Sequence, residues 1–153
     1  MAKKINTSDA ELILKLYDLR REAEMRKARN WWVVTFNPQS ADDFTKIAAE
    51  FGSQENNWLR QVMGYWNMAA TLVQRGAIDQ ELFLEPSVSG EMFVIYAKIK
   101  PYMKGIREKM GNPTFFANIE SLINGSKKGR DFLKYMETQM ARRREMMKAA
   151  KAS

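Results

Sequence analysis

Residues 53–76, SQENNWLRQVMGYWNMAATLVQRG, decide the fold because they form the strongest amphipathic helical pattern in the chain. Ser53 is typical of a helix N-cap, and Gly76 is typical of the left-handed residue that ends a helix. Between them, apolar side chains recur at helical spacing on one broad face: Trp58, Leu59, Val62, Tyr65, Trp66, Ala69, Leu72 and Val73. The pattern predicts a central core helix and places Trp58 and Trp66 in the core.

The segment that overlaps the end of this helix, LVQRGAIDQELF at residues 72–83, has two interpretations. As a site, Asp79 and Glu81 form a carboxylate pair of the kind used in acid–base catalysis. As a corner between helices, Gly76 ends one helix, Asp79 caps a short second helix, and Pro86 ends that helix. The corner is favoured, because a stop and a cap explain the same residues without any requirement for burial or distance.

Further helices are predicted along the rest of the chain. A long helix begins with Thr7 or Ser8 as its N-cap and ends before Pro38, since a residue that precedes proline avoids the helical region. Pro101 lies inside the helical pattern of residues 90–110 and is expected to kink that helix. The other helices are expected at residues 41–51, 113–124 and 126–140.

The chain is predicted to be a single all-α domain of about six or seven helices, with a proline-kinked central helix. Only WWVVTF at residues 31–36 is ambiguous between helix and strand. Apolar residues recur along nearly the whole chain, and no stretch rich in Gly, Ser or Pro marks a linker. We expect the helical domain to span residues 1–140, followed by a basic C-terminal tail at residues 141–153.

The composition excludes several classes of chemistry, because the 153 residues include no Cys and no His. Disulfides, thiolate nucleophiles, zinc ligation by Cys or His and Ser–His–Asp catalysis are therefore impossible. Acid–base catalysis would need a carboxylate, Lys or Tyr with a strongly shifted pKa. The acidic residues lack the spacing of a calcium loop, and di-iron motifs require His. No catalytic, cofactor-binding or metal-binding residue is predicted.

The formal net charge of +7 is distributed unevenly. It amounts to +3 over residues 1–30, −5 over residues 31–95, +3 over residues 96–125 and +6 over residues 126–153. An acidic middle with basic ends differs from the uniform basic surface that is typical of nucleic-acid binding. The start of the chain lacks the apolar core of a secretory signal, and residues 31–36 are too few to span a bilayer. A cytoplasmic protein without a transmembrane segment is expected.

Two regions are candidate interaction surfaces. Trp31 and Trp32 are adjacent in the sequence and cannot share one helix face, so one of them is expected to be exposed. The stretch KKGRDFLKYMETQMARRREMMK at residues 127–148 is basic, rich in Met and amphipathic, which suits an acidic partner, phosphate or anionic lipid. Its candidate contact residues are Lys134, Arg142, Arg143 and Arg144. A solvated C-terminal helix end is the alternative interpretation of the same residues.

Two stretches, WNMAATLVQRGAIDQELF and YAKIKPYMKGIREKMGNPTFFANIESLI, contain a spaced set of characteristic positions, namely Leu72, Val73, Arg75, Gly76, Ile78, Asp79, Glu81, Leu82, Tyr96, Lys100, Pro101, Asn112 and Pro113. On these positions, residues 58–124 resemble a bacterial family of helical proteins that share a domain of unknown function. This chain has Gly64 and Asn67 where relatives often carry Asn and Glu, so a polar site there is not expected here. The resemblance implies a helical fold and no particular activity.

Three functions are compatible with these observations. A non-enzymatic protein-interaction or scaffold module, with a protein partner or a second copy of the chain, is favoured. The first alternative is a peripheral binder of nucleic acid or an anionic membrane through the basic ends. Many members of the family that this chain resembles carry upstream membrane helices, so the resemblance is compatible with a location next to a membrane. The second alternative is an enzyme that uses carboxylates such as Asp79, Glu81 or Glu91 in a helical bundle.

Overall fold

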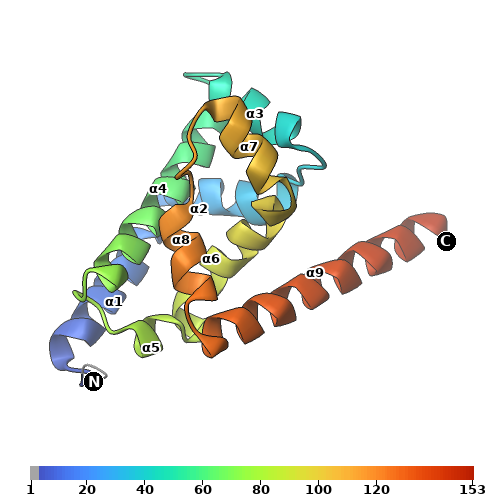
Figure 1. Cartoon of the computed structure of the whole chain (residues 1–153). Coiled ribbons are helices and arrows are strands. Elements are labelled where there is room, and N and C mark those ends of the chain that lie inside the picture. Colours follow the sequence, from blue (N-terminus) through green and yellow to red (C-terminus); the bar gives the residue numbers. More distant parts are fainter. Residues whose placement is uncertain (1–3) are drawn as a thin grey trace.

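The computed structural model describes residues 4–153, and these residues contain helices and no strand, which confirms the all-α prediction. Lys3, one of the basic residues of the N-terminal end, lies outside this range. The α-helices are shown in Figure 1 and are α1 (Thr7–Leu19), α2 (Ala23–Asn30), α3 (Ala41–Ala49), α4 (Gln54–Gln74), α5 (Gln80–Phe83), α6 (Pro86–Ile99), α7 (Met103–Met110), α8 (Ala117–Asn124) and α9 (Lys127–Ala152). A π-helix at Trp31–Thr35 and a 3-10 helix at Lys100–Tyr102 complete the order.

The core helix predicted from residues 53–76 is α4. The Ser53 side chain accepts a hydrogen bond from the Asn56 N–H at its start, and Gly76 follows its end with a φ of 81°. Most of its apolar face is buried, with Trp66 only 1% exposed, whereas Trp58, Tyr65 and Leu72 are half-buried against the core. α2, α3 and α8 pack against α4, and α8 also contacts α6. α4 and α6 therefore supply much of the buried core of the described chain.

The prediction of one long first helix over residues 7–36 is wrong in its continuity and in its N-cap. The chain turns at residues 20–22, which divides the predicted helix. Asn6, rather than Thr7 or Ser8, is the N-cap of α1: its side-chain oxygen accepts the Asp9 N–H, and its own backbone N–H donates to the Asp9 carboxylate, which completes a capping box. After the turn, the Glu22 carboxylate accepts the N–H groups of Glu24 and Met25 and so caps α2. A cap inside a helical pattern allows the chain to change direction.

Two prolines separate helices rather than bend them. Pro101 lies in the 3-10 helix between α6 and α7, so the kink predicted there divides the pattern of residues 90–110 into two helices. α5 ends at Phe83, before Pro86, as expected, and Pro86 also occupies the first turn of α6, where its missing N–H costs nothing. The helix predicted to start at Pro113 begins four residues later, at Ala117. The described chain therefore has more helices than the six or seven expected.

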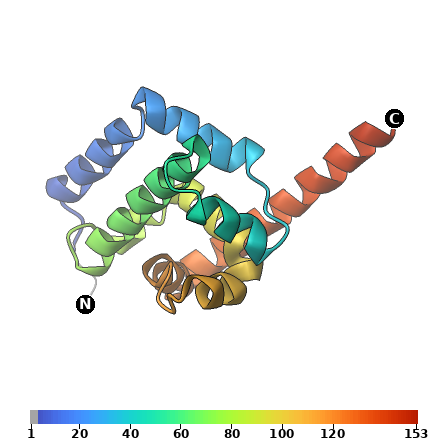
Figure 2. The same ribbon diagram turned by 90° about the horizontal axis from the view of Figure 1, so that it is seen from above.

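α9 begins against the body of the protein and ends away from it. The Ser126 side chain caps its first turn, and Gly129 lies so close to α8 that a Cβ atom there would overlap the carbonyl group of Ile123. Up to Met140, α9 packs on α6 and α8. Residues 141–153, predicted as a basic tail, continue the helix to Ala152 and are all exposed. Figures 1 and 2 both show this half of α9 extending beyond the rest of the molecule.

No helix in the described part of the chain is long and apolar enough to cross a bilayer.

Candidate interaction surface

The segment at residues 72–83 is a corner between helices. The Asp79 carboxylate accepts the Leu82 N–H at 2.9 Å and caps α5, while the Asp79 N–H donates to the buried Asp9 carboxylate at 2.9 Å. Glu81 lies on the surface, with its Oε2 atom 3.6 Å from the Lys128 Nζ atom. The prediction of a cap at Asp79 is confirmed. Asp79 therefore contributes to the structure of the corner, whereas Glu81 forms only an exposed ion pair, and the two carboxylates have different partners.

Trp31 and Trp32 are both buried, at 7% and 0% exposure, so the expectation that one of them is exposed is wrong. The π-helix widens the turn at these residues, and aromatic neighbours surround both rings. Trp31 stacks on Phe36 with ring centroids 4.7 Å apart, and Trp32 meets Phe36 edge-on at 5.1 Å. The Trp32 Nε1–H donates to the Leu59 carbonyl at 3.4 Å. The Trp32 ring is thus fully enclosed, and only a small part of Trp31 is exposed to a partner.

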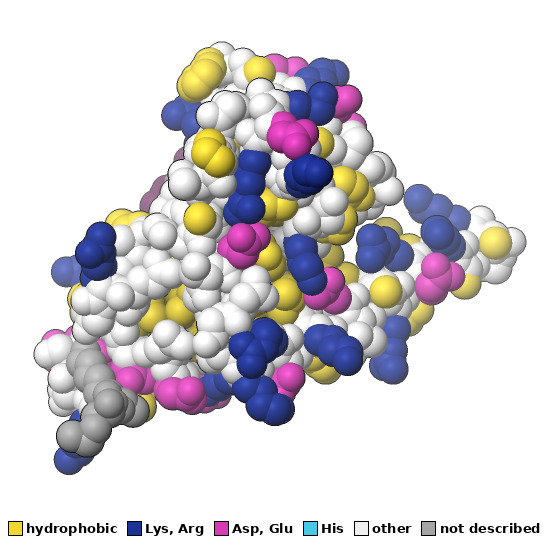
Figure 3. Space-filling view, viewed as in Figure 1, with side chains coloured by type: hydrophobic (Ala, Val, Ile, Leu, Met, Phe, Trp, Pro, Cys, Tyr) yellow, Lys and Arg dark blue, Asp and Glu magenta, His cyan; other side chains and the backbone are white. Residues whose placement is uncertain are grey.

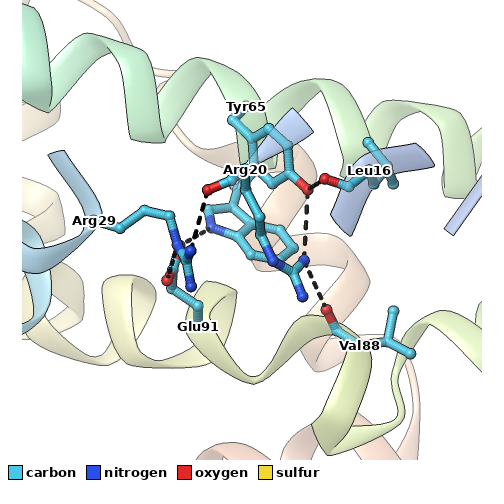
Figure 4. A network of polar contacts seen from close by, with 7 residues as sticks. Leu16, Arg20, Arg29, Tyr65, Val88 and Glu91 are labelled. Atoms are coloured by element: carbon cyan, nitrogen blue, oxygen red, sulfur yellow. Dashed lines mark hydrogen bonds and ion pairs between the residues drawn. The ribbon is translucent and has the colours of Figure 1, made fainter. Parts of the chain in front are cut away.

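A polar network lies between α1, α2, α4 and α6 (Figure 4). One part of it fixes the turn between α1 and α2. The Tyr65 hydroxyl donates to the Leu16 carbonyl at 2.6 Å, and Arg20 NH1 donates to the Val88 carbonyl at 3.3 Å. The Arg20 guanidinium also lies over the Trp66 ring, 5.4 Å from its centroid. Burial is the main cause that raises the pKa of Tyr65, which keeps its hydroxyl protonated as a donor.

The other part of the network joins α2, α4 and α6 through Glu91. The Arg29 Nε atom lies 2.6 Å from one Glu91 oxygen, and the Trp66 Nε1–H donates to the other at 3.0 Å. The side chains of Glu91 and Arg29 are only 13% and 29% exposed. Arg29 also donates to the Arg20 carbonyl at 3.2 Å. Glu91 was a candidate catalytic carboxylate, but both of its oxygens are used to hold three helices together.

Lys98 on α6 closes the end of the π-helix. Its Nζ atom donates to the carbonyls of Trp32, Val33 and Phe36 at 2.7, 2.9 and 2.7 Å. Carbonyls at the C-terminal end of a helix lack intrahelical partners and carry partial negative charge, which suits an ammonium group. Burial lowers the pKa of Lys98 to about 8, while the three carbonyl oxygens favour its charged form. Lys98 therefore fixes the π-helix against α6.

A groove of about 550 Å³ lies beside these residues, between the π-helix, α6 and α9. We call it the α9 groove. Its walls are largely apolar side chains, with polar groups from all three elements, and it is lined by Val33, Val34, Asn37, Glu91, Val94, Lys98, Tyr135, Met136, Gln139, Met140, Arg143, Arg144 and Met147. Val34 and Met147 are 70% and 61% exposed. In Figure 3, Lys and Arg side chains lie along α9 with hydrophobic side chains between them.

The structure brings only part of the predicted surface together. Arg143 and Arg144 line the α9 groove, whereas Lys134 and Arg142 are exposed and do not line it. Within residues 4–153, no acidic side chain lies within ion-pair distance of the three arginines, and the neighbouring Glu145 pairs with Lys148. Val34 and Met147 were not predicted. The spacing of Met136, Met140 and Met147 at helical intervals was the signal for one wall, but nothing local indicated Val34.

A second open hollow, of about 900 Å³, lies between the turn joining α1 to α2 and helix α4. Charges of both signs line it: Asp18, Glu22, Arg21, Arg26 and Arg60. Arg60 is already held by the side-chain oxygens of Asn56 and Asn57. The hollow therefore lacks a single charge preference. No group of His, Cys, Asp and Glu in the described residues could hold a metal ion.

Comparison with curated proteins and with solved structures gives no significant match. The sequence profile of the domain of unknown function DUF4760 matches residues 6–126, which include all of α1 to α8 and end at the N-cap of α9. The sides of the α9 groove formed by the π-helix and α6 thus belong to the matched region, and α9 follows it. Because this match covers most of the chain, the protein belongs to the family that shares the domain of unknown function DUF4760.

Proposed function

We propose that this protein is a non-enzymatic interaction module that binds a protein partner through the α9 groove. The observation that carries the proposal is an open groove in which exposed apolar side chains lie next to arginines without acidic partners. Covering apolar surface stabilises a complex by about 25 cal/mol for each Å² removed from water. Val34, Tyr135 and Met147 line the groove and are exposed, and a partner that covers them gains this term.

The outer half of α9 supports the same proposal. A helix without tertiary packing is only marginally stable in water, because its stability in proteins comes mainly from a packed face. Residues 141–152 are helical with every residue exposed. A partner in the α9 groove would supply the packing that this segment lacks.

An enzymatic function has less support from the candidate carboxylates. Asp79 caps α5, Glu81 lies near Lys128 on the surface, and Glu91 is held by Arg29 and Trp66. A general acid or base needs a free oxygen within reach of a substrate. These three carboxylates do not converge on one pocket, since only Glu91 lines the α9 groove.

Site-specific photo-cross-linking in the native host tests the proposal. A photo-reactive phenylalanine analogue at Met147 is expected to give a discrete protein adduct after irradiation, because this side chain points into the groove. The matched control is the same analogue at Phe51, which is 79% exposed but does not line the groove. Adducts of equal yield at both positions, or none at Met147, would contradict the proposal.

A second candidate is peripheral binding to nucleic acid or to an anionic membrane. The observation that favours it is the run of exposed basic residues on the outer half of α9, namely Arg142, Arg143, Arg144, Lys148 and Lys151. Such binding weakens steeply with salt, since it depends on neutralised phosphates or lipid headgroups. Retention on heparin or on anionic vesicles at low salt, lost at moderate salt, would support it. Passage through both at low salt would remove it.

A further inference from the structure

We infer that the occupant of the α9 groove is an acidic amphipathic helix of the partner protein. This inference rests on the proposed function, and it specifies the charge and the conformation of the bound segment. It follows from the charges that are left unpaired in the groove, from the chemistry of its walls and from its concave shape.

The unpaired charge in the groove is positive. Four charged residues line it: Glu91, Lys98, Arg143 and Arg144. Glu91 is bound by Arg29 and Trp66, and Lys98 is bound by three carbonyl oxygens. Arg143 and Arg144 have no acidic partner in the described chain. Carboxylates that reach these two guanidinium groups would form charge-assisted hydrogen bonds, so the complementary segment is acidic.

The walls of the groove favour a helix over an extended segment. α6, α9 and the π-helix use most of their backbone N–H and C=O groups internally, so the walls offer side chains and no sheet edge. An extended peptide against apolar walls would leave its own backbone groups without partners, which is costly. A helix satisfies those groups itself and presents apolar residues at helical spacing, as in other helix-in-groove complexes.

The composition and position of α9 disfavour two other occupants. A second copy that paired its outer α9 half with this one would bring Arg142, Arg143, Arg144, Lys148 and Lys151 against the same residues, with Glu145 as the only acidic side chain of each segment. Like charges in contact oppose such pairing. A bilayer surface is flat, so it can touch the projecting helix but cannot fill the space between α9 and Val33 on the π-helix.

Fluorescence anisotropy with the full chain tests the inference with three labelled synthetic peptides. The first is a designed helix with Leu on one face and Glu beside it, the second has the same composition with the Leu face scattered, and the third has Lys in place of Glu. Only the first is expected to bind. Combined Arg143→Glu and Arg144→Glu substitutions should weaken its binding by about tenfold or more, as expected for loss of paired charges.

Arg142→Glu is the matched control, since Arg142 is exposed in the same run but does not line the groove. It should change the affinity by less than about threefold, as a charge outside the contact does. Circular dichroism and thermal unfolding of all variants verify that they fold. Equal weakening by Arg142→Glu and the double variant would mean diffuse electrostatic attraction and would overturn the inference.

Three other results would also overturn it. They are equal binding of the scattered peptide, failure of all three peptides to bind, and light scattering that shows a dimer dissociated by the double variant. In the last case the occupant is a second copy. If all three peptides fail to bind and phosphatidylserine vesicles bind instead, the second result assigns the surface to lipid. A protein adduct at Met147 with no peptide binding leaves the proposed function standing and removes only the acidic helix.

Discussion

The protein contains two sets of cations whose environments are opposite. The inner cations, Arg20, Arg29 and Lys98, are partly or fully buried and donate to specific oxygen atoms of other elements. The outer cations, Arg142, Arg143 and Arg144, lie on the exposed half of α9 and have no acidic partner within residues 4–153. The inner cations hold helices together, whereas the outer cations are free to contact another molecule.

The energetic consequences of the two sets also differ. A charge that is removed from water is costly unless hydrogen bonds and an opposite charge compensate it, so removing a partner of an inner cation is destabilising. An exposed charge stays solvated, and its replacement changes stability little. Stability measurements can therefore separate the two sets without knowledge of the partner.

The largest expected loss of stability follows from Glu91→Ala. This change leaves the Arg29 Nε–H and the buried Trp66 N–H without the carboxylate that accepts from both, and it should lower the free energy of unfolding by about 2–3 kcal/mol. Chemical denaturation monitored by circular dichroism measures the effect. Glu91→Gln keeps an acceptor for Trp66 and should lose roughly half as much. A loss below about 0.5 kcal/mol for Glu91→Ala would show that the network contributes little.

Lys98→Met is expected to have the next largest effect. It removes the donor of three hydrogen bonds to the end of the π-helix and should lower the free energy of unfolding by about 1–2 kcal/mol. Lys100→Met is the matched control, because Lys100 pairs with Glu137 in a more exposed position, and its loss should stay within about 0.5 kcal/mol. Equal losses of unfolding free energy for the two variants would mean that Lys98 stabilises the protein no more than an exposed cation does.

Burial of the Lys98 ammonium group should also make the free energy of unfolding depend on pH. Its folded pKa of about 8 lies below the ordinary 10.5, so between these values the unfolded chain binds more protons than the folded chain. The cost of burying the charged ammonium group is thus present in full below pH 8 and decreases as the pH rises toward 10.5. The free energy of unfolding of the wild type, relative to Lys98→Met, should rise from pH 8 to pH 10. No rise would mean that the three carbonyls offset the burial.

Removal of residues 141–153 should have the smallest effect on stability. These residues are exposed, so the midpoint of thermal unfolding should change by less than about 3 °C, while the helical circular dichroism decreases. Binding of the acidic helical peptide should be lost together with Arg143, Arg144 and Met147. A fall of the midpoint by about 10 °C or more would mean that the outer half of α9 stabilises the body.

Local signals in the sequence were sufficient for much of the fold. Ser53 and Asp79 were correctly predicted as caps, because a cap depends on its own side chain and the next few N–H groups. Gly76 and Gly111 have positive φ at helix ends, as expected for residues without a Cβ. These features depend on a few neighbouring residues and are therefore visible in the sequence.

Two of the errors have a tertiary cause. The turn at residues 20–22 depends on Arg20 reaching Val88 and on Tyr65 reaching Leu16, which are contacts between distant segments. The burial of both Trp31 and Trp32 depends on Phe36 and on the C-terminal end of a π-helix that Lys98 holds. Periodicity in one segment contains no information about these partners.

The candidate surface could be predicted only in part for the same reason. Arg143 and Arg144 belong to a conspicuous basic run, and their exposure agrees with its composition. The opposite wall comes from Val33 and Val34, about a hundred residues earlier in the chain. Arg20 and Arg29 also occur in runs of charged residues, so the sequence does not separate inner from outer cations.

Gly129, in the first turn of α9, affects where the far end of this helix lies. α9 has 26 residues, so at 1.5 Å per residue it is about 39 Å long. A tilt of about 10° at its base would move its far end by roughly 7 Å. Because any Cβ at position 129 would overlap the Ile123 carbonyl, a larger residue there must move the first turn of α9 away from α8. The glycine at position 129 therefore helps to set the position of Arg143 and Arg144 near the other end of the helix.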